Sequence, residues 1–165
     1  MSNKNNNNLA QNTNFICGSS ALELTQIYCT SLALPGISLN HPFITSGNGS
    51  PLNLTGDNVM FNSLQLSLLV DEDYDVYFEF ITKLQENISF VNGSYSEQCF
   101  DFFIDITNSK GNHVFKINMV NCRIQSIGDL ELNTGSEDTE MLLPIELIFD
   151  HIEYVRGSQI LKISN

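Results

Sequence analysis

The sequence predicts a mainly β domain: two packed antiparallel sheets, as a sandwich or small barrel, with one flanking α-helix at about residues 71–86. Residues 64–70 and 100–106 alternate apolar and other side chains with the period of two that marks a strand with one buried face. Between them, one segment changes to the spacing of three and four that marks a helix. Strands and helices do not alternate along the chain, so a parallel sheet is not expected.

The predicted strands begin near the amino end. Short apolar runs from Phe15 to about Thr30 predict one or two strands, and Pro35 with Gly36 marks a turn or strand break between two β-like stretches. The clearest strand follows at residues 64–70, where the leucines at alternate positions face the core. These segments supply the first half of the sheets.

The helix is predicted from one apolar stripe that we expect to dock on a sheet. Asp71 can cap its amino end, and the acidic residues at 72, 73 and 75 then lie in the first turn, where the helix dipole favours negative charge. This explains the acidic run without a metal site. The residues expected to dock are Tyr77, Phe78, Ile81 and Leu84.

The second half of the chain predicts further antiparallel strands, giving about seven or eight in total. A turn at residues 108–112 joins the strand over residues 100–106 to further strands up to residue 127. In GDLELN, Leu130 and Leu132 are predicted on one face of a strand and Asp129 and Glu131 on the other. The final run, LLPIELIFDHIEYV, completes a hairpin with acidic outer positions.

We expect three regions in the chain. An Asn-rich, polar segment at residues 1–14 should be flexible, because it cannot bury enough apolar surface to offset its ordering entropy. One β domain covers residues 15–155, and residues 156–165 form a polar carboxyl-terminal tail. Within the domain, residues 41–57 are predicted to be a long exposed loop, of a length that usually binds something or is disordered.

Composition excludes several classes of function. With 19 acidic and 7 basic side chains, the formal charge of −12 repels nucleic acid, so tight DNA binding is not expected. The 4 cysteines show no zinc spacing and predict reduced, mostly buried thiols. No signal peptide or membrane span is predicted, and the expected compartment is a cytoplasm.

The search for catalytic motifs is negative, and we expect no enzyme, cofactor or metal. No P-loop, G-x-G-x-x-G, G-x-S-x-G or H-E-x-x-H pattern occurs. His151 follows Asp150, but adjacent strand positions point to opposite faces of a sheet. The acidic run Glu137, Asp138 and Glu140 is interpreted as a solvated turn in preference to a calcium site.

The order of these segments resembles the tail tube proteins of contractile-tailed bacteriophages. The resemblance covers most of residues 15–155 and depends on LPGISL, on FNSLQLSLLVDEDYDVYFEFI at the strand-to-helix junction, and on the later GDLELNTGSEDTE with its polar turn. It implies two packed antiparallel sheets with a flanking helix, a fold shared with the inner tubes of type VI secretion and related contractile injection machines. The Asn-rich leader and the tail RGSQILKISN depart from a typical tube subunit.

The resemblance implies a structural virion protein, assembled in the host cytoplasm and located in the tail. Six copies would join their sheets into a ring with a β-barrel lumen, and stacked rings would carry DNA without specific binding. Partners would be the sheath protein outside the tube and the baseplate and tail terminator proteins at its ends. Two alternatives stay open: an end protein, either a baseplate tube initiator or a tail terminator, and a carbohydrate-binding β-sandwich.

Two sets of residues are the candidates for function. The first is an acidic lining of the lumen, expected because acidic side chains would repel phosphate: Asp129, Glu131, Glu137 and Asp138. The second is an assembly loop reaching toward a neighbouring subunit or ring: His41, Phe43, Ile44, Asn48, Leu52 and Leu54.

Overall fold

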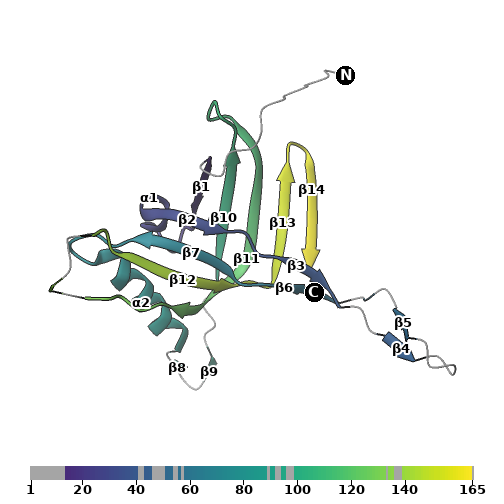
Figure 1. Ribbon diagram of the computed structural model, residues 1–165, viewed down its shortest axis with the longest axis horizontal. Coiled ribbons are helices and arrows are strands. Elements are labelled where there is room, and N and C mark those ends of the chain that lie inside the picture. The colour runs from purple at the N-terminus through teal and green to yellow at the C-terminus, as the bar shows by residue number, and fades with distance from the viewer. Residues whose placement is uncertain are drawn as a thin grey trace.

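The computed structural model confirms a mainly β protein with two sheets and a flanking helix (Figure 1). It describes residues 14–40, 43–45, 51–53, 56, 58–88, 90–91, 94–95, 99–132, 134–135 and 139–164. Residues 1–13, most of the segment expected to be flexible, lie outside the described part.

Eight strands form one antiparallel network that folds into two layers. The first layer, sheet I, has the order β1-β10-β11-β13-β14, and the second, sheet II, has the order β11-β12-β7-β2. Figure 1 shows the strands of sheet II running across those of sheet I. Strand bounds are β1 Phe15–Gly18, β2 Cys29–Ala33, β7 Leu64–Leu69, β10 Phe100–Thr107, β11 His113–Ile127, β12 Leu142–Ile148, β13 His151–Arg156 and β14 Gln159–Ser164.

The long strand β11 belongs to both sheets because it bends at Asn121. Asn121 has φ 57°, in the left-handed region that asparagine tolerates better than most residues. β11 pairs with β13 up to Val120 and with β10 up to Cys122, and from Arg123 onward it pairs with β12. A strand that passes from one sheet to another at a bend is how orthogonally packed sheets make their corners.

The core lies between the two sheets and follows the predicted alternation. In β7, Leu64, Leu66 and Leu68 are buried, and in β10 the buried set begins with Phe102 and Ile104. Sheet II also buries alternate residues of β12, and α2 adds two fully buried side chains. The remaining fully buried large residues include Leu22, Ile117, Met119, Leu143, Ile145, Leu147 and Ile152.

Pro144 is tolerated in the central strand β12 because no ladder hydrogen bond is needed at the position where its N–H is missing. The Gly128 N–H donates to the Pro144 carbonyl at 2.8 Å, so this side of Pro144 faces the end of β11, where the ladder stops. A Cβ on Gly128 would lie 2.3 Å from Pro144 Cγ, which only glycine avoids. β11 and β12 therefore separate at this point.

The flanking helix α2 spans Asp75–Ile88 and begins four residues later than predicted. The Asp71 carboxylate does accept hydrogen bonds from the N–H groups of Asp75 and Val76, at 3.2 and 3.1 Å, as an amino-terminal cap does. Tyr74 has φ 60° and ends the turn that precedes the helix. Of the acidic residues predicted for the first helical turn, only Asp75 therefore lies in it. A four-residue helix, α1 (Thr25–Tyr28), was not predicted.

The buried stripe of α2 differs from the predicted one. Val76 and Phe80 are fully buried, and Tyr77 and Leu84 pack partly buried against the core. The prediction for Phe78 is wrong, because its side chain is 60% exposed. Ile81 is half-buried. The error has a simple cause: an apolar residue follows another in this helix, and spacing does not say which of the two faces the sheets.

Residues 41–57 were predicted to be a long exposed loop, and the described part of that segment contains two strands instead. Strands β3 (Ile37–Leu39) and β6 (Val59–Phe61) pair antiparallel, and β4 (Phe43–Thr45) pairs with β5 (Pro51–Asn53) beyond them. Figure 1 shows β4 and β5 far from the two sheets. We call these four strands, β3 to β6, the ribbon.

Two further segments differ from expectation. The strand predicted in GDLELN does not form: residues 128–132 are irregular, Leu130 packs against the core and Leu132 is 75% exposed. The carboxyl-terminal tail forms a strand, β14, which pairs with β13 over six residues. Gly157 has φ 59° in the turn between them, a conformation that glycine adopts without strain.

After α2, short strands β8 (Phe90–Val91) and β9 (Ser94–Tyr95) pair around the predicted Asn-Gly turn, which lies outside the described residues.

Candidate functional site: surfaces for assembly

The ribbon carries apolar side chains that stay exposed in the described part of the chain. Ile37, Leu39 and Met60 are 40%, 48% and 54% exposed. Its base is anchored, since the ring of Phe61 lies 5.3 Å from that of Phe149. Among the described residues β3 and β6 pair only with each other, and a two-stranded ribbon is marginally stable in water without a covering surface.

Three of the six candidate loop residues are described, and all three lie in this ribbon. Phe43 and Ile44 lie in β4 and Leu52 lies in β5. The other three, His41, Asn48 and Leu54, lie outside the described residues. The loop signal located the segment, but Gly-rich composition concealed the strands, because pairing of such short strands depends on the partner and not on local alternation.

Sheet I ends in two strands that pair on one side only within the described chain. β14 forms an unbroken six-residue ladder with β13, and Ile160 and Leu161 in it are 64% and 55% exposed. β1 forms the opposite edge, where Ile16 is 46% exposed. Register puts Ile16 opposite Asp105 and Ile160 opposite Val155, so both isoleucines lie on the outer face. Edges with few charges and no proline or bulge favour pairing with another chain.

The helix α2 carries further exposed apolar side chains. Phe78 and Ile88 are 60% and 64% exposed, near its two ends. The sequence analysis treated Phe78 as core, so this surface was missed. A signal was available: Phe80 sits at the spacing of four from Val76 and Leu84, and that stripe excludes Phe78.

Acidic side chains are exposed on the connection between β11 and β12. Asp129 and Glu131 are both exposed there, whereas Glu137 and Asp138 lie outside the described residues. The outer face of sheet I instead carries both signs of charge: Lys116 lies 4.5 Å from the ring centre of Phe103, and Lys162 lies 3.6 Å from Glu153. The described part of the β11–β12 connection therefore exposes acidic side chains, whereas the outer face of sheet I carries acidic and basic ones.

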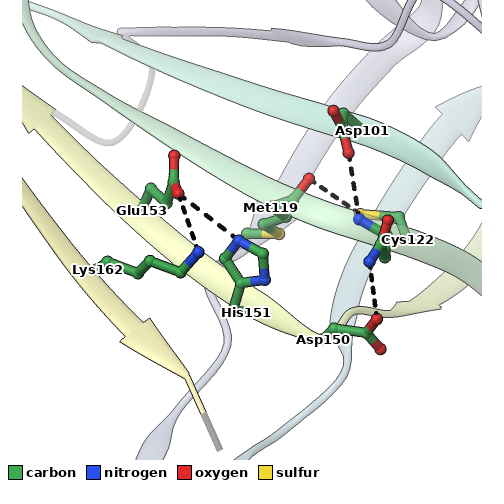
Figure 2. Close-up of polar contacts among 8 residues, drawn as sticks. Asp101, Met119, Cys122, Asp150, His151, Glu153 and Lys162 are labelled. Carbon is green, nitrogen blue, oxygen red and sulfur yellow. Dashed lines mark hydrogen bonds and ion pairs between the residues drawn. The ribbon is translucent and has the colours of Figure 1, made fainter.

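A polar network holds the bend of β11, and sequence reasoning did not find it. The Asn121 N–H donates to Asp101 Oδ1 at 3.2 Å, and its side-chain amide donates to Asp150 Oδ2 at 2.9 Å. Arg123 donates to the other Asp150 oxygen at 2.6 Å. Figure 2 shows Asp101 and Asp150 directed toward β11 from two sides. Its partners are up to 49 positions apart, so no local pattern signals it.

The neighbouring histidine lies beside the ion pair of Glu153 and Lys162. His151 Nε2 lies 3.6 Å from Glu153 Oε1, and Lys162 contacts the same oxygen (Figure 2). Asp150 instead contacts Arg123 and Asn121. It lies at the bend before β13 and not in a strand, so the expected alternation between adjacent strand positions does not apply to it. These contacts are those of a sheet surface, with no nucleophile joined to a base.

The described residues hold neither a metal-binding cluster nor a membrane-spanning helix. No group of three or more His, Cys, Asp and Glu side chains among them could hold a metal ion. No helix in the described part of the chain is long and apolar enough to cross a membrane.

Solved structures that match this fold include components of contractile injection systems and Hcp proteins. No protein-family model and no curated protein matches the sequence. The sheath/tube terminator of the PVC extracellular contractile injection system, in the extended state, matches with TM-score 0.66 and 18% identity, over 95% of this chain and 98% of that one. A chain of the anti-feeding prophage baseplate matches with TM-score 0.68 and 16% identity, over 92% and 99%. Hcp1 from Salmonella typhimurium matches with TM-score 0.55 and 11% identity, over 90% and 91%.

These similarities span nearly the whole of each chain, and the matched proteins are tube, terminator and baseplate components and Hcp proteins, not enzymes. At identities this low the likeness establishes architecture. The protein therefore has the fold of the tube, terminator and Hcp proteins of contractile injection systems, as its resemblance to tail tube proteins implies.

Proposed function

We propose that this protein is a structural subunit of the inner tube of a contractile tail, in which six copies form a ring and rings stack. The observation that carries the proposal is the full-length match of fold to tube and terminator components. Uncovered apolar side chains on the ribbon and at both edges of sheet I support it, because a monomer gains nothing from leaving them in water. Sheath, baseplate and terminator proteins are the proposed partners.

The ribbon is the proposed contact with a neighbouring subunit or ring. Covering Ile37, Leu39 and Met60 would remove apolar surface from water and supply the third layer that a two-stranded ribbon needs. Deleting residues 44–53, which leaves β3 and β6 intact, should give a folded protein that stacks poorly. Normal tubes from this variant would count against the role of the ribbon.

The edges of sheet I are the proposed contact within a ring. A ring needs two different surfaces on each subunit, and β14 and β1 are different edges of one sheet. Ile160→Lys should prevent ring formation, because it places a charge on an apolar contact. Val114→Lys is the matched control, since Val114 is also exposed, at 37%, but lies in β11 inside the sheet.

An acidic lumen that lets DNA pass is the proposed channel. The net charge of −12 makes repulsion of phosphate the dominant long-range term. Asp129, Glu131, Glu137 and Asp138 are its proposed lining. Changing Glu131, Glu137 and Asp138 to lysine should leave assembly intact but make the tubes retain DNA at low salt. Assembled tubes that release DNA as the parent does would remove these residues from the channel.

A specialised end ring is the second candidate, because a sheath/tube terminator and a tube terminating cap are among the matched structures. Electron microscopy of the purified protein separates the two. A tube subunit should form stacked rings or tubes, and an end protein should form discrete rings only. Monomers at all concentrations would contradict both.

A further inference from the structure

An acidic side chain of α2 reaches the beginning of α1. The Leu24 N–H donates a hydrogen bond to Glu79 Oε1 at 3.5 Å, across 55 positions of the sequence. Leu24 is the residue that precedes the first turn of α1, and its own side chain makes no capping hydrogen bond. The Glu79 carboxyl group therefore ties the amino end of α1 to α2.

Two buried polar atoms at this junction have no hydrogen-bond partner among the described residues. They are the second carboxyl oxygen, Glu79 Oε2, and the hydroxyl oxygen, Thr25 Oγ1. Thr25 directly follows Leu24 and is 0% exposed. Native proteins pair most buried polar atoms, because an unpaired one destabilises the fold. The two atoms can serve one another, since a protonated carboxyl group donates a hydrogen bond and a hydroxyl oxygen accepts one.

The surroundings of Glu79 favour its uncharged form. Burial raises the pKa of Glu79, and it outweighs the opposite effect of the Leu24 and Glu23 backbone N–H groups. The negative charge of Glu23 acts in the same direction as burial. The contact geometry agrees: at 3.5 Å, the bond from Leu24 is longer than the roughly 2.7–2.9 Å of a hydrogen bond to a charged carboxylate.

The other charges near Glu79 are few in the elements that surround it. The strands that α1 contacts, β1 and β7, contain no charged residue. On α2 the neighbours one turn away are Asp75 and Lys83, and Lys83 lies 3.0 Å from Glu86. The remaining titratable groups on the surrounding elements are Glu23, Tyr28 and Cys17. Burial therefore decides whether Glu79 holds a proton.

We propose that Glu79 and Thr25 form a proton-linked clasp between α2 and α1. In mildly acidic solution one proton from water binds to Glu79 Oε2, and the new O–H group donates a hydrogen bond to Thr25 Oγ1. Glu79 Oε1 continues to accept the hydrogen bond from Leu24. As the pH rises the proton returns to water and leaves a buried charge, so the hold on α1 weakens.

The direction of the pH effect follows from linkage. When the junction opens, Glu79 meets water and regains the ordinary Glu pKa of about 4.3. The ratio of closed to open junction is therefore highest in acid and falls as pH rises through the raised pKa of the closed form. The fall is about tenfold for each unit of difference between the two pKa values. The inference does not depend on the proposed function.

The test is a pH titration of the full chain by NMR, at a concentration where it is monomeric. The side-chain carboxyl carbon of Glu79 should titrate with a pKa above about 4.3, and the Leu24 amide shift should follow with the same midpoint. Hydrogen-exchange protection of the Ile27 and Tyr28 amides, which donate to the Leu24 carbonyl at 3.0 and 3.1 Å, should fall through that midpoint. A Glu79 pKa at or below the ordinary value, or a Leu24 shift that ignores its titration, would overturn the proposal.

Four variants test the pairing itself. Glu79→Gln keeps an uncharged side chain of the same shape and should make the protection independent of pH. Thr25→Val removes the acceptor and should lower the Glu79 pKa, whereas Thr25→Ser keeps the hydroxyl and the raised pKa. Glu72→Gln is the matched control, because it removes an exposed carboxylate just before α2 and should change nothing. An unchanged Glu79 pKa in Thr25→Val would refute the clasp. If that variant fails to fold, a Glu79 pKa that returns to the ordinary value in Thr25→Ser would refute it instead.

Discussion

Two phenylalanines two positions apart on α2 should differ greatly in what they contribute to stability. Phe80 is fully buried and Phe78 is 60% exposed. Removing a buried Phe side chain loses its transfer free energy and leaves a cavity, so Phe80→Ala should lower the free energy of unfolding by about 3–5 kcal/mol. Phe78→Ala removes a ring that mostly contacts water and should change it by about 0.5 kcal/mol or less.

The difference is measurable by thermal and urea unfolding. For a chain of this size, each kcal/mol shifts Tm by about 2–4 °C, so Phe80→Ala should lower Tm by roughly 6–20 °C. Both variants must be compared with the parent at a concentration where light scattering shows monomers, because assembly adds stability that depends on concentration.

Assembly provides the second half of the experiment. Phe78→Ala should leave the monomer intact, so any loss of sheath binding or assembly in this variant would identify an interface. The reasoning is refuted if Phe78→Ala lowers the urea midpoint as much as Phe80→Ala does. That result would mean that Phe78 faces the core, as its sequence spacing first suggested.

Three further predictions follow from single positions. Gly128→Ala should destabilise by about 1–3 kcal/mol in urea unfolding, because its Cβ would meet Pro144 Cγ at 2.3 Å; an unchanged midpoint would show that the strands separate freely. Asn121→Ala should lower Tm more than Asn121→Gly, since both lose the amide contact to Asp150 but only glycine relieves the left-handed φ; equal losses would contradict the strain. Burial raises the pKa of Glu79, so the folded state favours the protonated carboxyl group. The stability that this preference contributes is complete below the usual Glu pKa and is lost as pH rises through the raised value. Glu79→Gln should therefore gain stability relative to the parent as pH rises from 4 to 8 in urea titrations, and a constant difference would exclude this coupling.

The cap at Asp71 shows where local sequence is sufficient. Its carboxylate was expected to receive the first helical N–H groups, and it does so at Asp75 and Val76. Desolvation would raise the pKa of Asp71, but these backbone hydrogen bonds lower it overall. The start of the helix was misplaced because Tyr74 adopts a left-handed φ, which the sequence of an aromatic residue does not signal.

The sequence by itself determined the elements whose evidence lies in neighbouring residues. Alternation in β7 and β10 identified their buried faces, and the helical spacing after residue 71 identified α2. The order of these elements was enough to identify the fold that the injection-system components share. The apolar spacing of a strand or helix can be recognised in the sequence because it is set by which positions are buried: alternate residues in a strand and one stripe in a helix.

Elements that depend on distant partners became visible only in the folded chain. The ribbon, the strand β14 and the exposed position of Phe78 were missed, and the irregular path at GDLELN was mistaken for a strand. The bend at Asn121 depends on carboxylates at positions 101 and 150. A short polar segment becomes a strand only if the edge of another strand is available to pair with it. Which of two neighbouring apolar residues in a helix is buried depends on the surface against which the helix packs. Neither the pairing edge nor the packing surface can be recognised from neighbouring residues in the sequence, because both are formed by segments that are distant along the chain.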